Sequence, residues 1–298
     1  MRLSATELGA LLPLLLLYGP LLSSCGEEGA APEQAPVELA ASEKVVELPV
    51  VRRAWRRVVL DAGHGGQDTG AKGVSGALEK EITLAISSAC ARQLRAEGFE
   101  VLETRSSDEA IPLERRSAQA NAAGAGLFLS IHANSAPSEG VQGIETYYMD
   151  LAADEAAARL AERENRARSV SGDPTQSSVD SLISDLRMGA TAKQSRALAE
   201  TVHRSMLETL RGFYGPERIR DRGVRTAPFW VLLDSQMPAI LVEVGYLTNT
   251  KEEQRLRTHG FQQQVASGLT KAIIEFADIA AAAEPGPGEE GSGSEEGL

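Results

Sequence analysis

Apolar residues in the middle of the chain follow two alternating patterns. Short, nearly continuous apolar runs occupy residues 56–63, 99–105 and 127–134 and predict buried β-strands. Between them, residues 79–97 repeat apolar side chains every three or four positions, which is the spacing of an amphipathic helix, and residues 113–124 predict a second helix. Strands that alternate with helices predict a single-domain α/β fold, in which the sheet is mainly parallel and buried.

The second half of the pattern is less regular. A strand is predicted over residues 143–149, and residues 150–190 then interrupt the alternation with a largely polar segment of roughly forty residues. An interruption of this length is usually functional or disordered. The remaining predicted elements are a helix over 151–168 inside the insertion, a long helix over 191–213, strands near 223–233 and 239–244, and a closing helix over 261–278.

The N-terminal region has the pattern of an export signal. Residues 8–22 form an apolar block that follows Arg2 and is too short to span a membrane comfortably, so we predict a signal peptide over residues 1–24. The segment "LSSC" ends at Cys25 and resembles the lipobox of bacterial lipoproteins, which implies cleavage before Cys25 and its lipidation. An ordinary cleaved signal with a chance cysteine is the alternative. Gly26 follows Cys25, and we expect an anchor in the outer membrane if the source is Gram-negative.

Both flanks of the predicted catalytic domain, residues 53–279, are acidic and lack hydrophobic periodicity. Residues 25–52 are interpreted as a flexible linker that begins at the lipidated cysteine, and residues 280–298 as a disordered acidic tail. Of the net charge of −12, residues 26–49 and 284–298 each carry −5, so the folded region is close to neutral. This charge does not favour nucleic-acid binding, and we predict no nucleic-acid partner.

Several polar residues lie where the apolar pattern does not explain them. His64 follows the first predicted strand inside a glycine-rich loop, and His132 ends another strand. Glu79 opens the helix after the loop, and Glu243 lies in the apolar run "AILVEVGYL". Ligand sites of parallel α/β sheets lie outside the carboxyl ends of the strands, which is where both histidines are predicted to be.

These four residues together have the chemistry of a metallohydrolase. Two imidazoles and a carboxylate form a three-ligand zinc site with an open position, and a second carboxylate serves as general base. Each residue also has a structural interpretation: Glu79 as an acid at a helix N-terminus, His132 as a core histidine, and Glu243 as a solvent-facing edge residue. A buried, unpaired Glu243 would cost several kcal/mol. No HExxH signature is present, and spacing alone leaves both interpretations open.

Four segments resemble, in order and spacing, the zinc-dependent N-acetylmuramoyl-L-alanine amidases. They are "VVLDAGHGGQDTGAKG", "LEKEITLAI", "SIHAN" and "MPAILVEVGYLTN". The resemblance implies one zinc ion per chain, held by His64, Glu79 and His132, with Glu243 as the catalytic carboxylate. It also implies a twisted, mostly parallel sheet of about six strands flanked by helices. The glycines would clear space around the zinc-bound histidine and the substrate.

The activity that the resemblance implies is hydrolysis of the amide bond between N-acetylmuramic acid and L-alanine in peptidoglycan, for cell-wall remodelling or daughter-cell separation. Residues 150–190 look like the regulatory segment of division amidases, in which a helix occludes the active site until an activator protein displaces it. Glu164 is the expected blocking residue at the zinc, and residues 179–186 the expected activator-binding region.

Two other functions remain open at this point. A zinc peptidase that cuts the stem peptide itself would use the same ligands with a different pocket. A catalytically silent wall-binding lipoprotein would need no turnover, but the presence of all four site residues argues against it, because degenerate amidases typically lose a ligand or the glutamate.

Overall fold

The computed structural model describes residues 54–150, 152–167 and 178–283, and for residues 178–190 it describes the backbone alone. The predicted signal peptide, Cys25, the linker and nearly all of the acidic tail lie outside the described residues. No helix among the described residues is long and apolar enough to cross a membrane.

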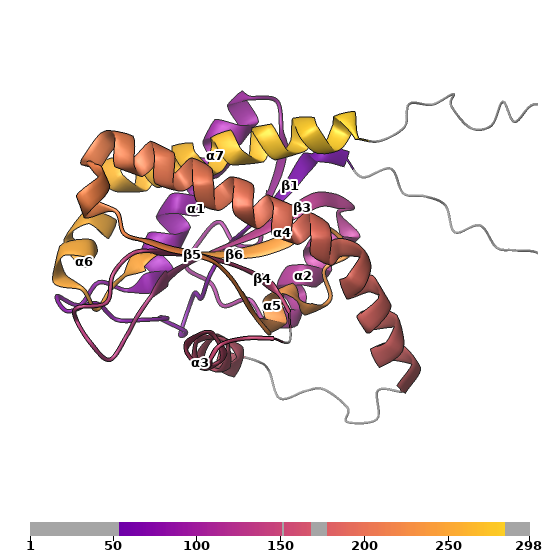
Figure 1. The fold of residues 1–298 in the computed structure, drawn as a ribbon, viewed down its shortest axis with the longest axis horizontal. Helices are drawn as coiled ribbons and strands as arrows, with labels where there is room; N and C mark the ends of the chain where they lie inside the picture. Colours follow the sequence, from indigo (N-terminus) through magenta and orange to yellow (C-terminus); the bar gives the residue numbers. More distant parts are fainter. Residues whose placement is uncertain (1–53, 151, 168–177, 284–298) are drawn as a thin grey trace, which may run out of the picture. The chain divides into compact units, whose positions relative to one another are not determined.

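The described residues form one α/β domain around a single sheet of six strands (Figure 1). The strands lie in the order β2-β1-β3-β6-β4-β5. β1, β2, β3 and β6 are parallel, whereas β4 runs antiparallel to β6 and parallel to β5. The prediction of a mostly parallel, six-stranded sheet is therefore confirmed. The strands are β1 (Ala54–Ala62), β2 (Glu100–Glu103), β3 (Ala125–Asn134), β4 (Ile144–Met149), β5 (Asp221–Ala227) and β6 (Ala239–Tyr246).

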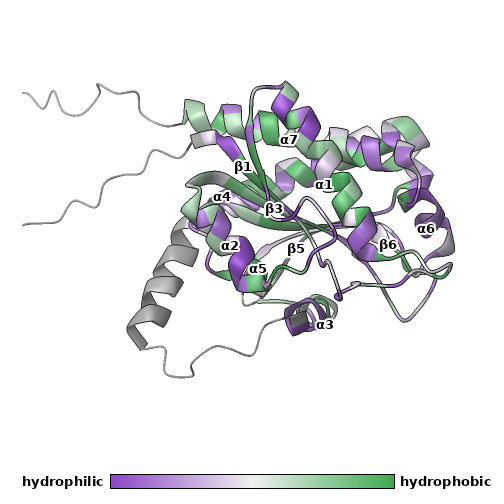
Figure 2. Cartoon of the chain, turned by 180° about the vertical axis from the view of Figure 1, so that it is seen from behind, coloured by the Kyte–Doolittle hydropathy of each residue, from purple (hydrophilic) through white to green (hydrophobic). Residues whose placement is uncertain are grey.

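Helices cover both faces of the sheet, and an apolar core fills each interface. α1, α4 and α7 pack on one face, and α2, α3 and α5 pack on the other (Figure 1). β3 is buried along its whole length, and Figure 2 shows hydrophobic residues gathered on the central strands. The helices are α1 (Glu79–Ala96), α2 (Leu113–Ala122), α3 (Glu155–Glu164), α4 (Ser178–Tyr214), α5 (Trp230–Leu233), α6 (Thr250–Leu256) and α7 (His259–Ala282), with short 3-10 turns at Asn165–Ala167 and Pro216–Arg218.

The structure corrects several predicted boundaries. The predicted strand near 223–233 ends at Ala227, and Trp230–Leu233 form the helix α5 because Asn165 of the neighbouring turn accepts the Trp230 N–H at 2.9 Å. The predicted helix over 151–168 is shorter, because Asp154 caps α3 and the helix passes into a 3-10 turn at Asn165. α6 was not predicted. α7 continues to Ala282, so the predicted boundary of the acidic tail at residue 280 is too early.

Candidate functional site

The glycine loop after β1 is shaped by two buried arginines. Arg105 donates to the carbonyl oxygens of Ala62 and Gly63 at 2.9 and 2.8 Å, and Arg116 donates to those of Ala62 and His64 at 2.8 and 2.9 Å. Arg116 is itself paired with the buried Asp61 at 2.7 Å. His64 has a φ of 60°, the only positive value of a non-glycine residue among the described residues. The hydrogen bonds to its neighbours' carbonyls hold this left-handed conformation, which orients the imidazole.

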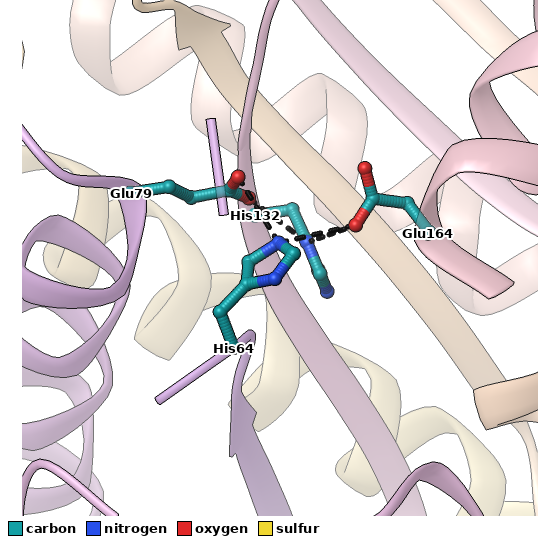
Figure 3. Close-up of side chains that lie close together, drawn as sticks. All are labelled: His64, Glu79, His132 and Glu164. Carbon is teal, nitrogen blue, oxygen red and sulfur yellow. Dashed lines mark hydrogen bonds and ion pairs between the residues drawn. The ribbon is translucent and has the colours of Figure 1, made fainter. Parts of the chain in front are cut away.

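The structure brings His64, Glu79 and His132 together with Glu164 of α3 (Figure 3). His64 Nε2 lies 3.0 Å from Glu79 Oε2 and 3.1 Å from Glu164 Oε2. His132 Nδ1 lies 2.9 Å from Glu79 Oε1 and 3.4 Å from Glu164 Oε2. The four ligand atoms lie within 4.8 Å of one another, so two imidazoles and two carboxylates converge on one point.

The spacing of these atoms fits a tetrahedral zinc ion. Ligand atoms at about 2.0–2.1 Å from zinc in a tetrahedron lie about 3.3 Å from one another. The four histidine–carboxylate distances, 2.9–3.4 Å, are close to this value. The buried His64 Nε2 and Glu164 Oε2 have no hydrogen-bond partner. His64 Nδ1 lies 2.9 Å from Asp68 Oδ2, which places the ring proton on Nδ1 and leaves the Nε2 lone pair for a cation. The donor set therefore fits zinc.

Glu79 is buried at the start of α1 and is held by backbone donors. Its carboxylate accepts the N–H groups of Ala71 at 2.7 Å and Ala133 at 2.9 Å. Burial alone would raise its pKa, but the two histidines outweigh this effect and hold the pKa of Glu79 well below its usual value. Glu79 is therefore a buried, ionised carboxylate that faces the two histidines, which an acid serving only the helix N-terminus would not need to do.

Two glycines of the loop leave room for this cluster. A Cβ atom on Gly63 would lie 2.5 Å from His132 Nε2, and one on Gly70 would lie 2.5 Å from both Glu79 Oε2 and His64 Cδ2. Any side chain at either position would therefore displace a residue of the cluster. The glycines therefore clear space for the side chains of the cluster, as the resemblance implied for His64.

Glu243 lies beside the cluster on β6, where it is the register partner of His132 on β3 and of Glu145 on β4. It is completely buried, and neither of its carboxylate oxygens has a hydrogen-bond partner. Burial, followed by the proximity of the Glu79 and Glu164 carboxylates, raises its pKa well above the usual value. β6 lies between β3 and β4 in the sheet, which rules out the interpretation of Glu243 as an edge residue that faces solvent. A buried carboxyl that readily takes a proton is suited to general base and acid work.

α3 is fixed above the cluster at its C-terminal end. Arg163 donates to Asn134 Oδ1 at 2.9 Å and to the Ser135 carbonyl and hydroxyl at 3.0 and 2.9 Å. Arg163 Nε also contacts Glu164 at 3.0 Å. A small pocket opens on the two histidines, and Glu164 and Asn165 form part of its wall. Glu164 thus lies at the two histidines, where it was expected.

Glu145 is a buried residue that sequence reasoning missed. One of its oxygens accepts from Asn134 Nδ2 at 3.2 Å and from the Tyr147 and Tyr246 hydroxyls at 3.0 Å each. The other accepts from two arginines of β5. A glutamate inside the apolar strand "GIETYYM" is the same signal that singled out Glu243, and it would have pointed to Glu145 as well.

Comparisons with known proteins agree with this geometry. The Amidase_3 family, described as N-acetylmuramoyl-L-alanine amidase, matches residues 58–275. The chain is 35% identical over 226 residues to N-acetylmuramoyl-L-alanine amidase AmiA of Escherichia coli (strain K12), covering 74% of this chain and 76% of that protein. It is 36% identical over 223 residues to AmiC of Neisseria meningitidis, covering 74% of this chain and 52% of the longer relative. The solved structure of AmiC2 of Nostoc punctiforme aligns with a TM-score of 0.57 and 31% identity, covering 74% of this chain and 97% of that one. The chain therefore belongs to the Amidase_3 family of N-acetylmuramoyl-L-alanine amidases.

Proposed function

We propose that this enzyme is a zinc-dependent hydrolase that cleaves the amide bond between N-acetylmuramic acid and the L-alanine of the stem peptide. The proposal of zinc rests on the convergence of His64, Glu79 and His132, in which each histidine nitrogen lies 2.9–3.0 Å from a Glu79 oxygen. Family membership supports peptidoglycan as the substrate.

Zinc, when bound, supplies a Lewis acid for the amide carbonyl and lowers the pKa of water. Glu243 accepts a proton from the attacking water and later gives it to the leaving amine of L-alanine. Its burial and its unpartnered oxygens suit this double role, because they keep the carboxyl free and make its protonated state accessible. Asp68 holds the tautomer of His64, so that the ring presents Nε2 to the site.

We also propose that α3 inhibits the enzyme at rest. The Glu164 carboxylate lies 3.1 Å from His64 Nε2 and 3.4 Å from His132 Nδ1, so it would serve as a fourth ligand of a zinc held by His64, Glu79 and His132, and substrate would have to displace α3. A partner protein that binds the insertion would favour the displaced state, because it interacts with that state more strongly. Residues 179–186, the expected binding region, lie in the first turns of α4.

Digestion of purified peptidoglycan tests the proposed reaction. Mass spectrometry should find intact stem peptides with a free L-alanine amino terminus, and their release should stop when a chelator removes zinc and resume when zinc is restored. A stem-peptide peptidase would instead release internal fragments. A protein that binds the wall and releases nothing, with zinc loaded and α3 displaced, would contradict the enzymatic proposal.

We further propose that Cys25 carries lipid and tethers the catalytic domain to a membrane of the cell envelope, with the outer membrane expected in a Gram-negative source. Two or more acyl chains are needed for stable anchoring. Wild-type protein should partition with membranes, and Cys25→Ser should release it or block its processing. A mature wild-type protein without acyl groups by mass spectrometry would contradict this proposal.

A further inference from the structure

Arg225 connects the buried network beside Glu243 with the first turn of α3. Its Nη1 donates to Glu145 at 3.1 Å, and its Nη2 pairs with Asp154, the residue that caps the N-terminus of α3. Arg222 donates to the same Glu145 oxygen at 2.6 Å. The four side chains carry two positive and two negative charges, so the set is balanced only while α3 is in place.

α3 therefore contacts the rest of the domain through a carboxylate at each end. Glu164 lies on the histidine cluster, and Asp154 lies on Arg225. Ten residues separate them, so the helical rise of 1.5 Å per residue places the two contacts about 15 Å apart. α3 packs against β5, the strand that carries Arg225, so both contacts are lost together when α3 moves away (Figure 1).

The two members of the Arg225–Asp154 pair are held very differently. The Arg225 side chain is 21% exposed and forms an ion pair with the buried Glu145, whereas the Asp154 side chain is 54% exposed. An ion pair with such an exposed partner contributes little stability, so Asp154 is exchanged at small cost. Once α3 leaves, Arg222, Arg225 and Glu145 retain one net positive charge, and Arg225 Nη2 has lost its acceptor. A carboxylate from another molecule could therefore accept from Arg225 Nη2 in place of Asp154.

We propose that Arg225 binds a carboxylate of the stem peptide in place of Asp154. The inference rests on the proposed function, which puts the scissile amide at the histidine cluster. Stem peptides offer the α-carboxylate of D-glutamate at the second residue and, where the third residue is a diamino acid, another carboxylate on its long side chain. An extended chain spans at most about 3.6 Å per residue, so the third residue and its side chain match a distance of about 15 Å. In the closed state, Glu164 would then take the place of the scissile amide at the cluster, and Asp154 the place of the peptide carboxylate at Arg225.

Peptide binding to full-length, zinc-loaded protein tests this role without requiring turnover. The background is Asp154→Asn with Glu164→Gln, which neutralises both carboxylates of α3, and asparagine caps a helix as well as aspartate does. The probes are L-alanyl-γ-D-glutamyl-diaminopimelate, the same peptide amidated at the second residue, and the same peptide amidated on the third residue's side-chain carboxylate. Calorimetry compares this background with the same background carrying Arg225→Gln.

We expect the background protein to bind the free peptide roughly tenfold more tightly than the peptide amidated at the third residue, which is the scale of one charge-assisted hydrogen bond. Arg225→Gln should abolish that preference and leave the affinity for the amidated peptide unchanged. A preference that follows the second residue instead would still support carboxylate binding by Arg225. Equal effects of Arg225→Gln on all three peptides, or no effect, would overturn the proposal.

Two further measurements keep the outcome clear. If Arg225→Gln does not fold, Arg225→Lys replaces it. Lysine retains the charge but lacks the forked guanidinium that contacts Glu145 and the ligand at the same time, so we expect a smaller preference for the free peptide. An unchanged preference would count against carboxylate binding by Arg225. Digestion of peptidoglycan by the background protein is measured separately. Absence of released stem peptides would contradict the proposed function, whereas the peptide preference still decides the role of Arg225.

Discussion

Glu164 Oε2 lies 3.1 Å from His64 Nε2, and neither buried atom has a hydrogen-bond partner. A carboxylate in this position competes with substrate for the proposed metal. We therefore expect Glu164→Gln to raise basal amidase activity by roughly tenfold or more, because the neutral amide weakens the closed state and shifts the population towards the open one. Release of stem peptides from purified peptidoglycan, without any partner protein, measures the effect.

Glu162→Gln is the matched control, because Glu162 lies on the same helix, is exposed, and forms a surface ion pair with Arg166. It should leave basal activity unchanged. If the Glu164 variant remains folded and zinc-loaded but is no more active than the wild type, the docked α3 does not inhibit the enzyme.

Removal of either proposed histidine ligand should abolish stoichiometric zinc binding. His64→Ala and His132→Ala each remove one of the two nitrogen donors of the cluster, and a single histidine with carboxylates is a much weaker site for zinc. Elemental analysis of the purified proteins measures this loss. His259→Ala, at the exposed start of α7, should retain one zinc per chain. Full occupancy in His64→Ala and His132→Ala would refute the assignment of the ligands.

Glu243→Gln should separate metal binding from turnover. Glu243 lies beside the cluster but outside the four groups that converge on it, so the variant should keep its zinc. Loss of a general base should lower kcat by roughly 100-fold or more. Zinc content and kcat measured on the same sample decide the matter: if zinc is lost together with activity, Glu243 is a ligand and its proposed role is wrong.

Gly63→Ala should damage the site without unfolding the domain. The added Cβ would lie 2.5 Å from the His132 ring, which must move to accommodate it. Displacement of a ligand side chain should weaken zinc affinity about 10- to 100-fold, the scale found when the support of a ligand is lost. Competition with a chelator measures the affinity, and Gly212→Ala, where a Cβ meets no atom within 4 Å, is the control. Equal zinc affinities in the two variants would argue against the spacing role of Gly63.

Asp61→Asn should destabilise the domain by about 3–5 kcal/mol, because it leaves the buried Arg116 without its ionic partner. Burial alone would raise the pKa of Asp61, but Arg116, Thr104 and Ser130 outweigh it and lower the pKa below the usual value. A lowered pKa stabilises the fold at pH values above the unfolded pKa of about 3.9, and this contribution is lost as the pH falls through the folded value.

The difference in unfolding free energy between wild type and Asp61→Asn should therefore shrink on acidification below about pH 4. Urea unfolding at several pH values measures it. Asp278→Asn, which breaks an exposed pair with Arg56, should change stability little at any pH. A constant difference between wild type and Asp61→Asn down to the acid transition would contradict the ionised state of Asp61.

The strands and helices around the site could be predicted because their signals are local. The runs that end near His64 and His132 are continuous and apolar, and the helix that begins at Glu79 has a clear period of three to four residues. By contrast, Trp230–Leu233 read as part of a strand, because periodicity cannot assign so short an apolar run. α6 has one local signal in the sequence, an asparagine in the capping position before Thr250, and the structure shows that Asn249 accepts the N–H groups of Lys251 and Glu252.

The support of the site depends on contacts between distant segments, which no local pattern reveals. Arg116 lies on α2 and reaches back to the His64 carbonyl, and Arg225 on β5 reaches Glu145 on β4. In the sequence, both arginines have the appearance of ordinary surface residues. The resemblance to the amidases identified the residues that form the cluster. The residues that hold them in place could be recognised only in the structure.

Arg105 and Arg116 hold the backbone around His64 through contacts in which no metal takes part. Because these contacts come from the protein itself, we expect the loop and the fold to withstand treatment with a chelator. Zinc fingers behave in the opposite way, because their fold depends on the metal. If the proposed zinc is bound here, the local zinc supply would set the fraction of active molecules without changing the amount of folded protein.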